Sequence, residues 1–212
     1  AATGAFTVLN AYSLSGTLNV QGTANLTLSG NSTLPAGATT IDVKTPMGAL
    51  TLAGYVDGVD STSSLVKRGL GTLAITNNSG LMGGVRVEAG TLLFAGLNGA
   101  AAAPIGGGNL TLGNAGLVQL FNSGVSSYGV ISYSTPLVVS SSATAGNLQL
   151  GNNGGTNVSN TIELSTVNMT GGQILNVVAN NNYNLRVLTL ATTGSTPVKI
   201  NPQAGTTVTI YD

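Results

Sequence analysis

The residues in this chain whose types and spacing could do chemistry are two aspartates, in the segment Asp57-Gly58-Val59-Asp60. Cleavage of a polysaccharide needs two or more carboxylates, or an Arg or Lys base beside metal-binding acids, gathered on one face. Only Asp57 and Asp60 lie close in the sequence, and the glycine between them indicates a loop. We interpret them as solvated turn aspartates, which leaves a calcium contact or a catalytic pair as open alternatives. We predict no catalytic residue.

The residue types that most often hold metals and cofactors are missing. The chain has no cysteine, no histidine and no tryptophan. Missing cysteine excludes disulfides and thiolate zinc sites, and missing histidine removes the commonest metal ligand and the usual general base. A calcium-binding repeat would need Asp at regular positions in successive glycine-rich turns, and that pattern is absent from the sequence. We therefore predict no cofactor, no metal site and no enzymatic activity.

Charge is scarce and balanced. Charged residues make up 6% of the 212 residues, with six basic and six acidic side chains, and none occurs between Ala89 and Ile162. Nucleic acids and anionic membranes need clustered Lys and Arg, so neither is an expected partner. We interpret the adjacent pair Lys67-Arg68 as a solvated pair at the end of a strand, and Arg86 with Glu88 as an exposed pair. No run of 18 apolar residues occurs, so no membrane-spanning helix is encoded.

Short alternating segments dominate the chain, and helix signals are nearly absent. Each segment places an aliphatic residue on one face and Thr, Asn or a charge on the other, which is typical of a half-buried strand. Turns of Gly and Asn separate the segments, because these residues accept a positive φ at little cost. The predicted strands are 24–28, 49–52, 71–75, 85–88, 109–112, 147–150 and 207–210.

The spacing between comparable strands distinguishes a solenoid from the other all-β folds. Gly71, Gly90, Gly108 and Gly146 follow one another at steps of 19, 18 and 38, and we interpret the last interval as two steps of 19. A fixed period near 20 is the signature of a solenoid whose coils stack at about 4.8 Å. We therefore predict an all-β parallel β-helix (β-solenoid) with coils of about 19 residues in a single domain, 1–212. A β-sandwich is the alternative, although it normally carries more aromatic core than three Phe and six Tyr provide.

One segment carries a specific motif, Lys67 to Leu92. It reads Lys-x-Gly-x-Gly-Thr-Leu, a short strand, an Asn-rich turn, Gly-Gly, a second strand and a second Gly-Thr-Leu. This segment closely resembles the autotransporter-associated β-strand repeat. The resemblance implies a secreted bacterial protein whose parallel β-helix is right-handed, located outside the cell or on its surface. It leaves open whether a translocator barrel belongs to the full-length precursor.

These features predict a non-enzymatic extracellular module with a structural or adhesive role. It would be a passenger-like stalk or the subunit of a self-assembling surface fibre. Exposed strand edges at the ends of such a stack pair with other chains unless they are capped, so we expect residues 1–30 to be a capping or inter-subunit strand region. A monomeric passenger fragment is the alternative to end-to-end assembly. A carbohydrate-binding or carbohydrate-active β-helix, of lyase or hydrolase type, is the alternative function, with a cell-surface or matrix polysaccharide as partner.

Two further surface patterns are weaker. Six Asn-x-Ser/Thr triplets arise readily in a chain so rich in these residues, and they would matter only if the source glycosylates asparagine. Threonine pairs do not recur at one fixed phase, which disfavours an ice-binding face. The triplets begin at Asn25, Asn31, Asn77, Asn109, Asn157 and Asn168.

Overall fold

The chain folds entirely from β-strands and the turns between them. The computed structural model describes residues 4–95, 99, 101–102 and 106–211, and within these ranges it contains no helix. Its strands form one 18-stranded sheet and one three-stranded sheet. All the strand pairs in the described part are parallel, without the antiparallel pairs of a β-sandwich. The prediction of an all-β fold is confirmed.

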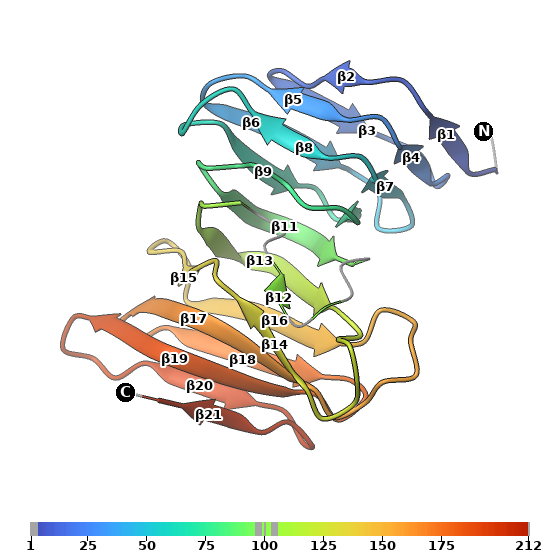
Figure 1. Cartoon of the computed structure of the whole chain (residues 1–212). Coiled ribbons are helices and arrows are strands. Elements are labelled where there is room, and N and C mark those ends of the chain that lie inside the picture. The colour runs from blue at the N-terminus through green and yellow to red at the C-terminus, as the bar shows by residue number, and fades with distance from the viewer. Residues whose placement is uncertain (1–3, 96–98, 100, 103–105, 212) are drawn as a thin grey trace.

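The pairings arrange the strands in three parallel ladders, which the chain visits repeatedly in the order I, II, III. Figure 1 shows the resulting stack, with β1 at one end and β21 at the other. Ladder I runs through β1 (Phe6–Val8), β4 (Leu26–Leu28), β7 (Ala49–Leu52), β10 (Thr72–Ile75), the second halves of β11 (Val85–Phe94) and β13 (Leu110–Phe121), β16 (Ala145–Gly151), β18 (Ile174–Ala179) and β20 (Lys199–Pro202).

Ladder II follows ladder I along the chain. Its first part contains β2 (Tyr12–Ser13), β5 (Ser32–Leu34) and β8 (Val56–Gly58), and a bridge joins Val56 to Ser79. Its second part contains β12 (Ala101–Ala102), β14 (Val130–Tyr133), the first halves of β17 (Thr161–Thr170) and β19 (Asn184–Thr193), and β21 (Val208–Ile210).

Ladder III carries the surface that is described below as the candidate site. The long strands β11 and β13 turn from ladder III into ladder I, and β17 and β19 turn from ladder II into ladder III. Ladder III contains β3 (Thr17–Val20), β6 (Ala38–Val43), β9 (Ser64–Arg68), the first halves of β11 and β13, β15 (Leu137–Val139) and the second halves of β17 and β19.

The core consists of aliphatic columns that follow the ladders. Because side chains alternate across a strand, every second residue of each strand points into the stack. In the middle of ladder I the inward residues lie directly opposite one another from strand to strand, and each is fully buried. Burial of one such side chain contributes about 1.5–3 kcal/mol, so the columns are the main source of stability. One column contains Leu50, Leu73, Leu92, Val118, Leu148 and Val177.

The spacing between successive strands of a ladder is less regular than predicted. Thr72 lies opposite Thr91, a step of 19, whereas Ser132 lies opposite Glu163, a step of 31. Gly90 lies opposite Gly116 rather than Gly108, so the predicted place of Gly108 in the series is wrong. Gly146 does belong to the series, because Leu117 lies opposite Asn147, but it follows Gly116 at one step of 30 and not Gly108 at two steps of 19. The reason is physical: the inward columns fix the strands, whereas the corners between strands differ in length.

Candidate functional site

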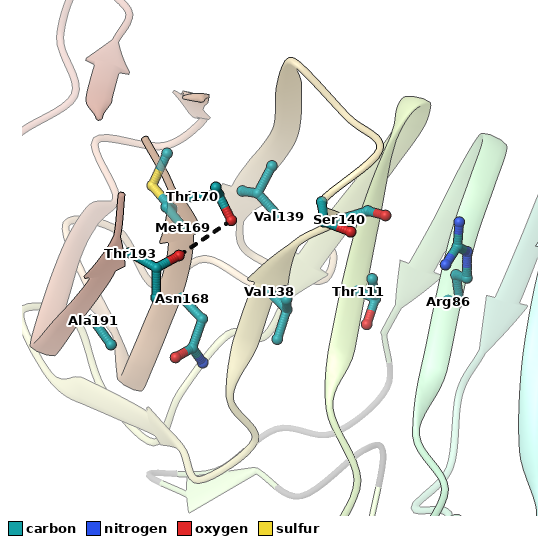
Figure 2. Close-up of a pocket in the computed structure, with 11 residues that line it drawn as sticks. Arg86, Thr111, Val138, Val139, Ser140, Asn168, Met169, Thr170, Ala191 and Thr193 are labelled. Atoms are coloured by element: carbon teal, nitrogen blue, oxygen red, sulfur yellow. Dashed lines mark hydrogen bonds between the residues drawn. The ribbon is translucent and has the colours of Figure 1, made fainter. Parts of the chain in front are cut away.

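The outer face of ladder III carries two adjoining hollows, which we call together the ladder III groove. Their volumes are about 310 and 330 Å³, and both are lined by Arg86 and Thr111. The first hollow extends over β15, β17 and β19, as Figure 2 shows, and the second extends over β9 toward β6. The first is also lined by Val138, Val139, Ser140, Ser141, Asn168, Met169, Thr170, Ala191 and Thr193, and the second by Ala38, Ser64, Leu65, Val66, Gly83, Gly84, Val85 and Asn109.

A row of paired residues forms the floor of the groove. For the members from Val66 to Asn168, the strand neighbours on either side are buried, so alternation places the row on the outside. Adjacent strands lie about 4.8 Å apart, and the row therefore runs straight along the stack. Its members are Val66, Arg86, Thr111, Val138, Asn168 and Ala191, each paired with the next.

Hydroxyl groups line one side of the first hollow. Ser140 and Ser141 follow directly after β15, and the Ser140 hydroxyl lies 3.1 Å from that of Ser142. At the ends of β17 and β19, the Thr193 hydroxyl donates a hydrogen bond to the Thr170 hydroxyl at 3.4 Å (Figure 2). These groups can donate and accept hydrogen bonds, so this side suits a polyhydroxylated ligand.

Two arginines share one carboxylate beside the groove. Arg68 Nε lies 2.6 Å from Glu88 Oε2, and Arg86 Nε lies 3.2 Å from Glu88 Oε1. The hydrogen bond from Arg68, assisted by Arg86, holds the pKa of Glu88 below its usual range, so the carboxylate remains ionised at neutral pH. The predicted pair of Arg86 with Glu88 is present. No local pattern in the sequence indicated that Arg68 of β9 also contacts Glu88, because this contact spans 20 residues of the chain.

Lys67 lies inside the stack, which corrects its interpretation as part of a solvated pair. Its side chain is fully buried, and Nζ donates hydrogen bonds to the carbonyl oxygens of Arg68, Gly69 and Ala89 at 2.5, 2.8 and 3.1 Å. Burial lowers the pKa of Lys67 to about 8, although Asp42 opposes this shift. Alternation from the buried Leu65 already places Lys67 on the inner face, and this was the signal in the sequence for its true position.

The two aspartates singled out in the sequence lie away from the groove. Asp57 is in β8, where its Oδ1 accepts a hydrogen bond from the Gly58 amide at 2.9 Å. Asp60 follows in a turn, and its Oδ1 accepts hydrogen bonds from the Thr62 amide and hydroxyl at 2.8 and 2.7 Å. These bonds lower the pKa of Asp60. No third acidic residue joins them in the described ranges to make a metal-ion cluster.

The six asparagines of the Asn-x-Ser/Thr triplets are dispersed over the surface. Asn25, Asn31, Asn77 and Asn109 are exposed, whereas Asn157 and Asn168 are half-buried. Asn157 Nδ2 donates a hydrogen bond to the carbonyl oxygen of Ser123 at 2.9 Å, and Asn168 lies on the floor of the ladder III groove. Among the described elements there is no helix that could cross a membrane.

Part of the chain is similar in sequence to a bacterial adhesin. The chain is similar to the adhesin BmaC autotransporter of Brucella suis biovar 1 (strain 1330), with 43% identity over 79 residues. These residues are 37% of this chain and 2% of the adhesin, so the chain spans a small fraction of that protein's length. No family model matches the chain, and no solved structure matches it. The likeness therefore indicates at most a relation to autotransporters.

Proposed function

We propose that this chain is a segment of a right-handed parallel β-helix that serves as a non-enzymatic adhesive module outside a bacterial cell. The observation that carries the proposal is the 43% identity to an autotransporter adhesin, in a chain whose described strands pair only in parallel. The proposed location is the cell surface or the extracellular space, because a passenger-like module would act there.

The winding of the chain supports the β-helix. Three ladders visited in constant order, with each strand lying beside the strand of the previous passage, are what a β-solenoid requires. Right-handed connections between parallel strands are strongly favoured, because the right-handed twist of the strands lets such a connection pack back onto the sheet. Lys67, which opens the segment that resembles the autotransporter-associated repeat, also supports the stacked arrangement, because its ammonium joins the carbonyl groups of two successive passages.

The surface chemistry favours binding over catalysis. Asp57 in β8 and Asp60 in the turn after it accept hydrogen bonds from their own neighbours in the chain, and neither lines the ladder III groove. The groove itself is lined by hydroxyl, amide and aliphatic groups with Arg86. Such a surface can recognise a ligand through shape and hydrogen bonds, without groups arranged for proton transfer.

The test is adhesion of the purified chain to cells. Fluorescent beads coated with the chain should bind epithelial cells in a saturable manner, and free chain should compete. Beads coated with the Leu73→Asp variant, whose core column carries a buried charge, should not bind. Equal retention of both kinds of bead would refute an adhesive role for the folded chain.

The enzymatic alternative has its own measurement. If the chain cleaves polysaccharides, it should reduce the viscosity of acidic or neutral polysaccharide solutions. We expect no loss of viscosity. Turnover that disappears in a variant carrying both Asp57→Ala and Asp60→Ala would replace the adhesive proposal with a catalytic one.

End-to-end assembly is a second candidate, and exposed apolar side chains favour it. Phe6 and Leu9 lie at or beside β1 with exposed fractions of 50% and 75%, and a hollow of about 360 Å³ adjoins Phe6. At the other end of the stack, Ile210 of β21 and Tyr211 are also exposed. A second copy could continue the ladders head to tail. Light scattering should then show a mass that increases with concentration, and a constant monomer mass at high concentration would exclude this assembly.

A further inference from the structure

We propose that the ladder III groove binds a linear polysaccharide that carries carboxylate groups, with Arg86 as the residue that selects the charge. The inference rests on the proposed adhesive function, because it names the ligand that such a module would hold. It concerns the outer face of the stack and does not depend on how the ends of the stack are covered.

The shape of the groove suits an extended polymer that runs along the stack. The two hollows meet at Arg86 and Thr111, and the row on the floor crosses successive strands from Val66 to Ala191. Each step between strands is about 4.8 Å, which is close to the length of one sugar unit in an extended glycan. Successive sugars would therefore meet successive strands.

A peptide strand is a poorer fit to this surface. Extended peptides usually bind by adding a strand to an open sheet edge, where they pair with free backbone groups. In the groove, β11 already pairs with β9 and β13, and β13 already pairs with β15. The groove thus offers side chains, not a free edge.

The lining matches the two kinds of surface that a sugar ring presents. Thr111 and Asn168 on the floor, with Thr193 beside it, can exchange hydrogen bonds with ring hydroxyl groups. Val138 lies between Thr111 and Asn168 in the row, half-buried, and offers an apolar patch to the C–H face of a sugar ring. Figure 2 shows these residues side by side along the groove.

The charge distribution selects an acidic polymer. Among the described residues that line the two hollows, Arg86 is the one charged side chain. Its Nε faces Glu88, but the side chain is 44% exposed, and Glu88 is shared with Arg68. Asp42 also acts on Arg68 from β6, but it is paired with Lys44 at 3.8 Å. The two guanidinium groups beside Glu88 therefore leave a positive excess, and a ligand carboxylate can pair with it through the planar fork of an arginine. A single such residue is too few for a nucleic acid, which needs several phosphate contacts.

The experiment measures binding to matched acidic and neutral polysaccharides by calorimetry or interferometry. The probes are oligomers of hyaluronan, alginate and polygalacturonate, and the neutral counterpart of the last is its methyl ester. At least one acidic probe should bind the wild type, and esterification should weaken the binding. If the acidic probes bind no better than the ester, or none binds, the inference is wrong.

A pair of variants tests the role of Arg86. Arg86→Gln should weaken the binding of the acidic probe by about fivefold to tenfold, the usual effect of losing one charge-assisted contact. Lys199→Gln removes the same charge from an exposed position on β20 of ladder I, and its affinity should stay within about twofold of the wild type. Circular dichroism should show both variants folded. An unchanged affinity in folded Arg86→Gln would overturn the assignment.

The inference and the adhesive proposal can fail separately. If beads bind cells but no acidic polysaccharide binds the groove, the assigned ligand is wrong and the adhesive role is retained. If the groove binds the acidic probe with the predicted dependence on Arg86, but the beads do not bind cells, the polysaccharide site stands and cell adhesion falls.

Discussion

Lys67 of β9 donates a hydrogen bond from Nζ to the carbonyl oxygen of Ala89 in β11, 22 residues further along the chain, at 3.1 Å. The same ammonium also binds the carbonyl oxygen of Gly69. One buried side chain thus joins two successive passages of the backbone at the corner between ladders III and I. Without the lysine, these carbonyl groups would lose this donor.

Replacing this lysine should destabilise the fold. The variant Lys67→Met keeps a long apolar stem but removes three hydrogen bonds to carbonyl oxygens. We expect a loss of about 2–3 kcal/mol in the free energy of unfolding, measured by chemical denaturation. Lys44→Met is the control, because Lys44 is exposed, and it should change stability by less than about 0.5 kcal/mol. A stable Lys67→Met protein would show that the carbonyl groups find other donors.

The same residue predicts a dependence of stability on pH. Burial lowers the pKa of Lys67 to about 8 in the folded chain, whereas an unfolded lysine keeps its proton to about pH 10.4. Between these values the unfolded state binds the additional proton, so the free energy of unfolding should rise with pH. Denaturation between pH 7.5 and 9 measures this slope, about one pH unit or more below the ordinary tyrosine pKa of about 10. Lys67→Met should lack it, and an equal slope in both proteins would assign it to another group.

Glycine should be required at position 90 for two reasons. Gly90 has a φ of +68°, and a Cβ there would overlap the carbonyl oxygens of Gly69 and Gly71 in the turn between β9 and β10. Gly90→Ala should therefore cost about 3 kcal/mol or more. Gly16 has nearly the same φ, +67°, but open space around it, so Gly16→Ala should cost only about 1–2 kcal/mol. Thermal unfolding of the two variants separates the overlap from the backbone strain, and equal losses would contradict the close approach.

A buried tyrosine should contribute through its hydroxyl group. Tyr183 is fully buried, donates a hydrogen bond to the carbonyl oxygen of Asn122 at 2.8 Å and accepts one from Asn160 Nδ2 at 3.1 Å. Tyr183→Phe keeps the ring and should lower the free energy of unfolding by about 1–2 kcal/mol. Tyr128→Phe is the control, because Tyr128 is 80% exposed and should show little change. Urea denaturation compares the two, and similar values would argue against the network.

Local structure was largely predictable from the sequence. The predicted strand 49–52 is β7, and the predicted strand 71–75 contains β10, Thr72–Ile75. Alternation of aliphatic and polar residues is a local property, and it correctly indicated the core side chains of the predicted strands from 49–52 to 147–150. It failed at Ile210 of 207–210, which is 43% exposed, and at Lys67, which is buried. The glycine turns between strands were equally readable, because positive φ is a local requirement.

The register between strands and the candidate site were not predictable in the same way. The step from a residue to its ladder partner varies from 19 at Thr72 to 31 at Ser132, because the corners follow no fixed length. Gly90 therefore appeared to correspond to Gly108, whereas it pairs with Gly116. The ladder III groove depends on these registers, since neighbouring strands must bring residues such as Arg86 and Thr111 into one row.

The unequal corners have a consequence for how such a chain can evolve. Three residues separate β7 from β8, whereas nine separate β16 from β17, yet the strands of the same ladders stay in register. An insertion at a corner lengthens a surface loop without moving the columns inside. Relatives of this chain can therefore differ widely in length and in outer loops while they keep one interior, and deletions or duplications of a whole passage would preserve it as well.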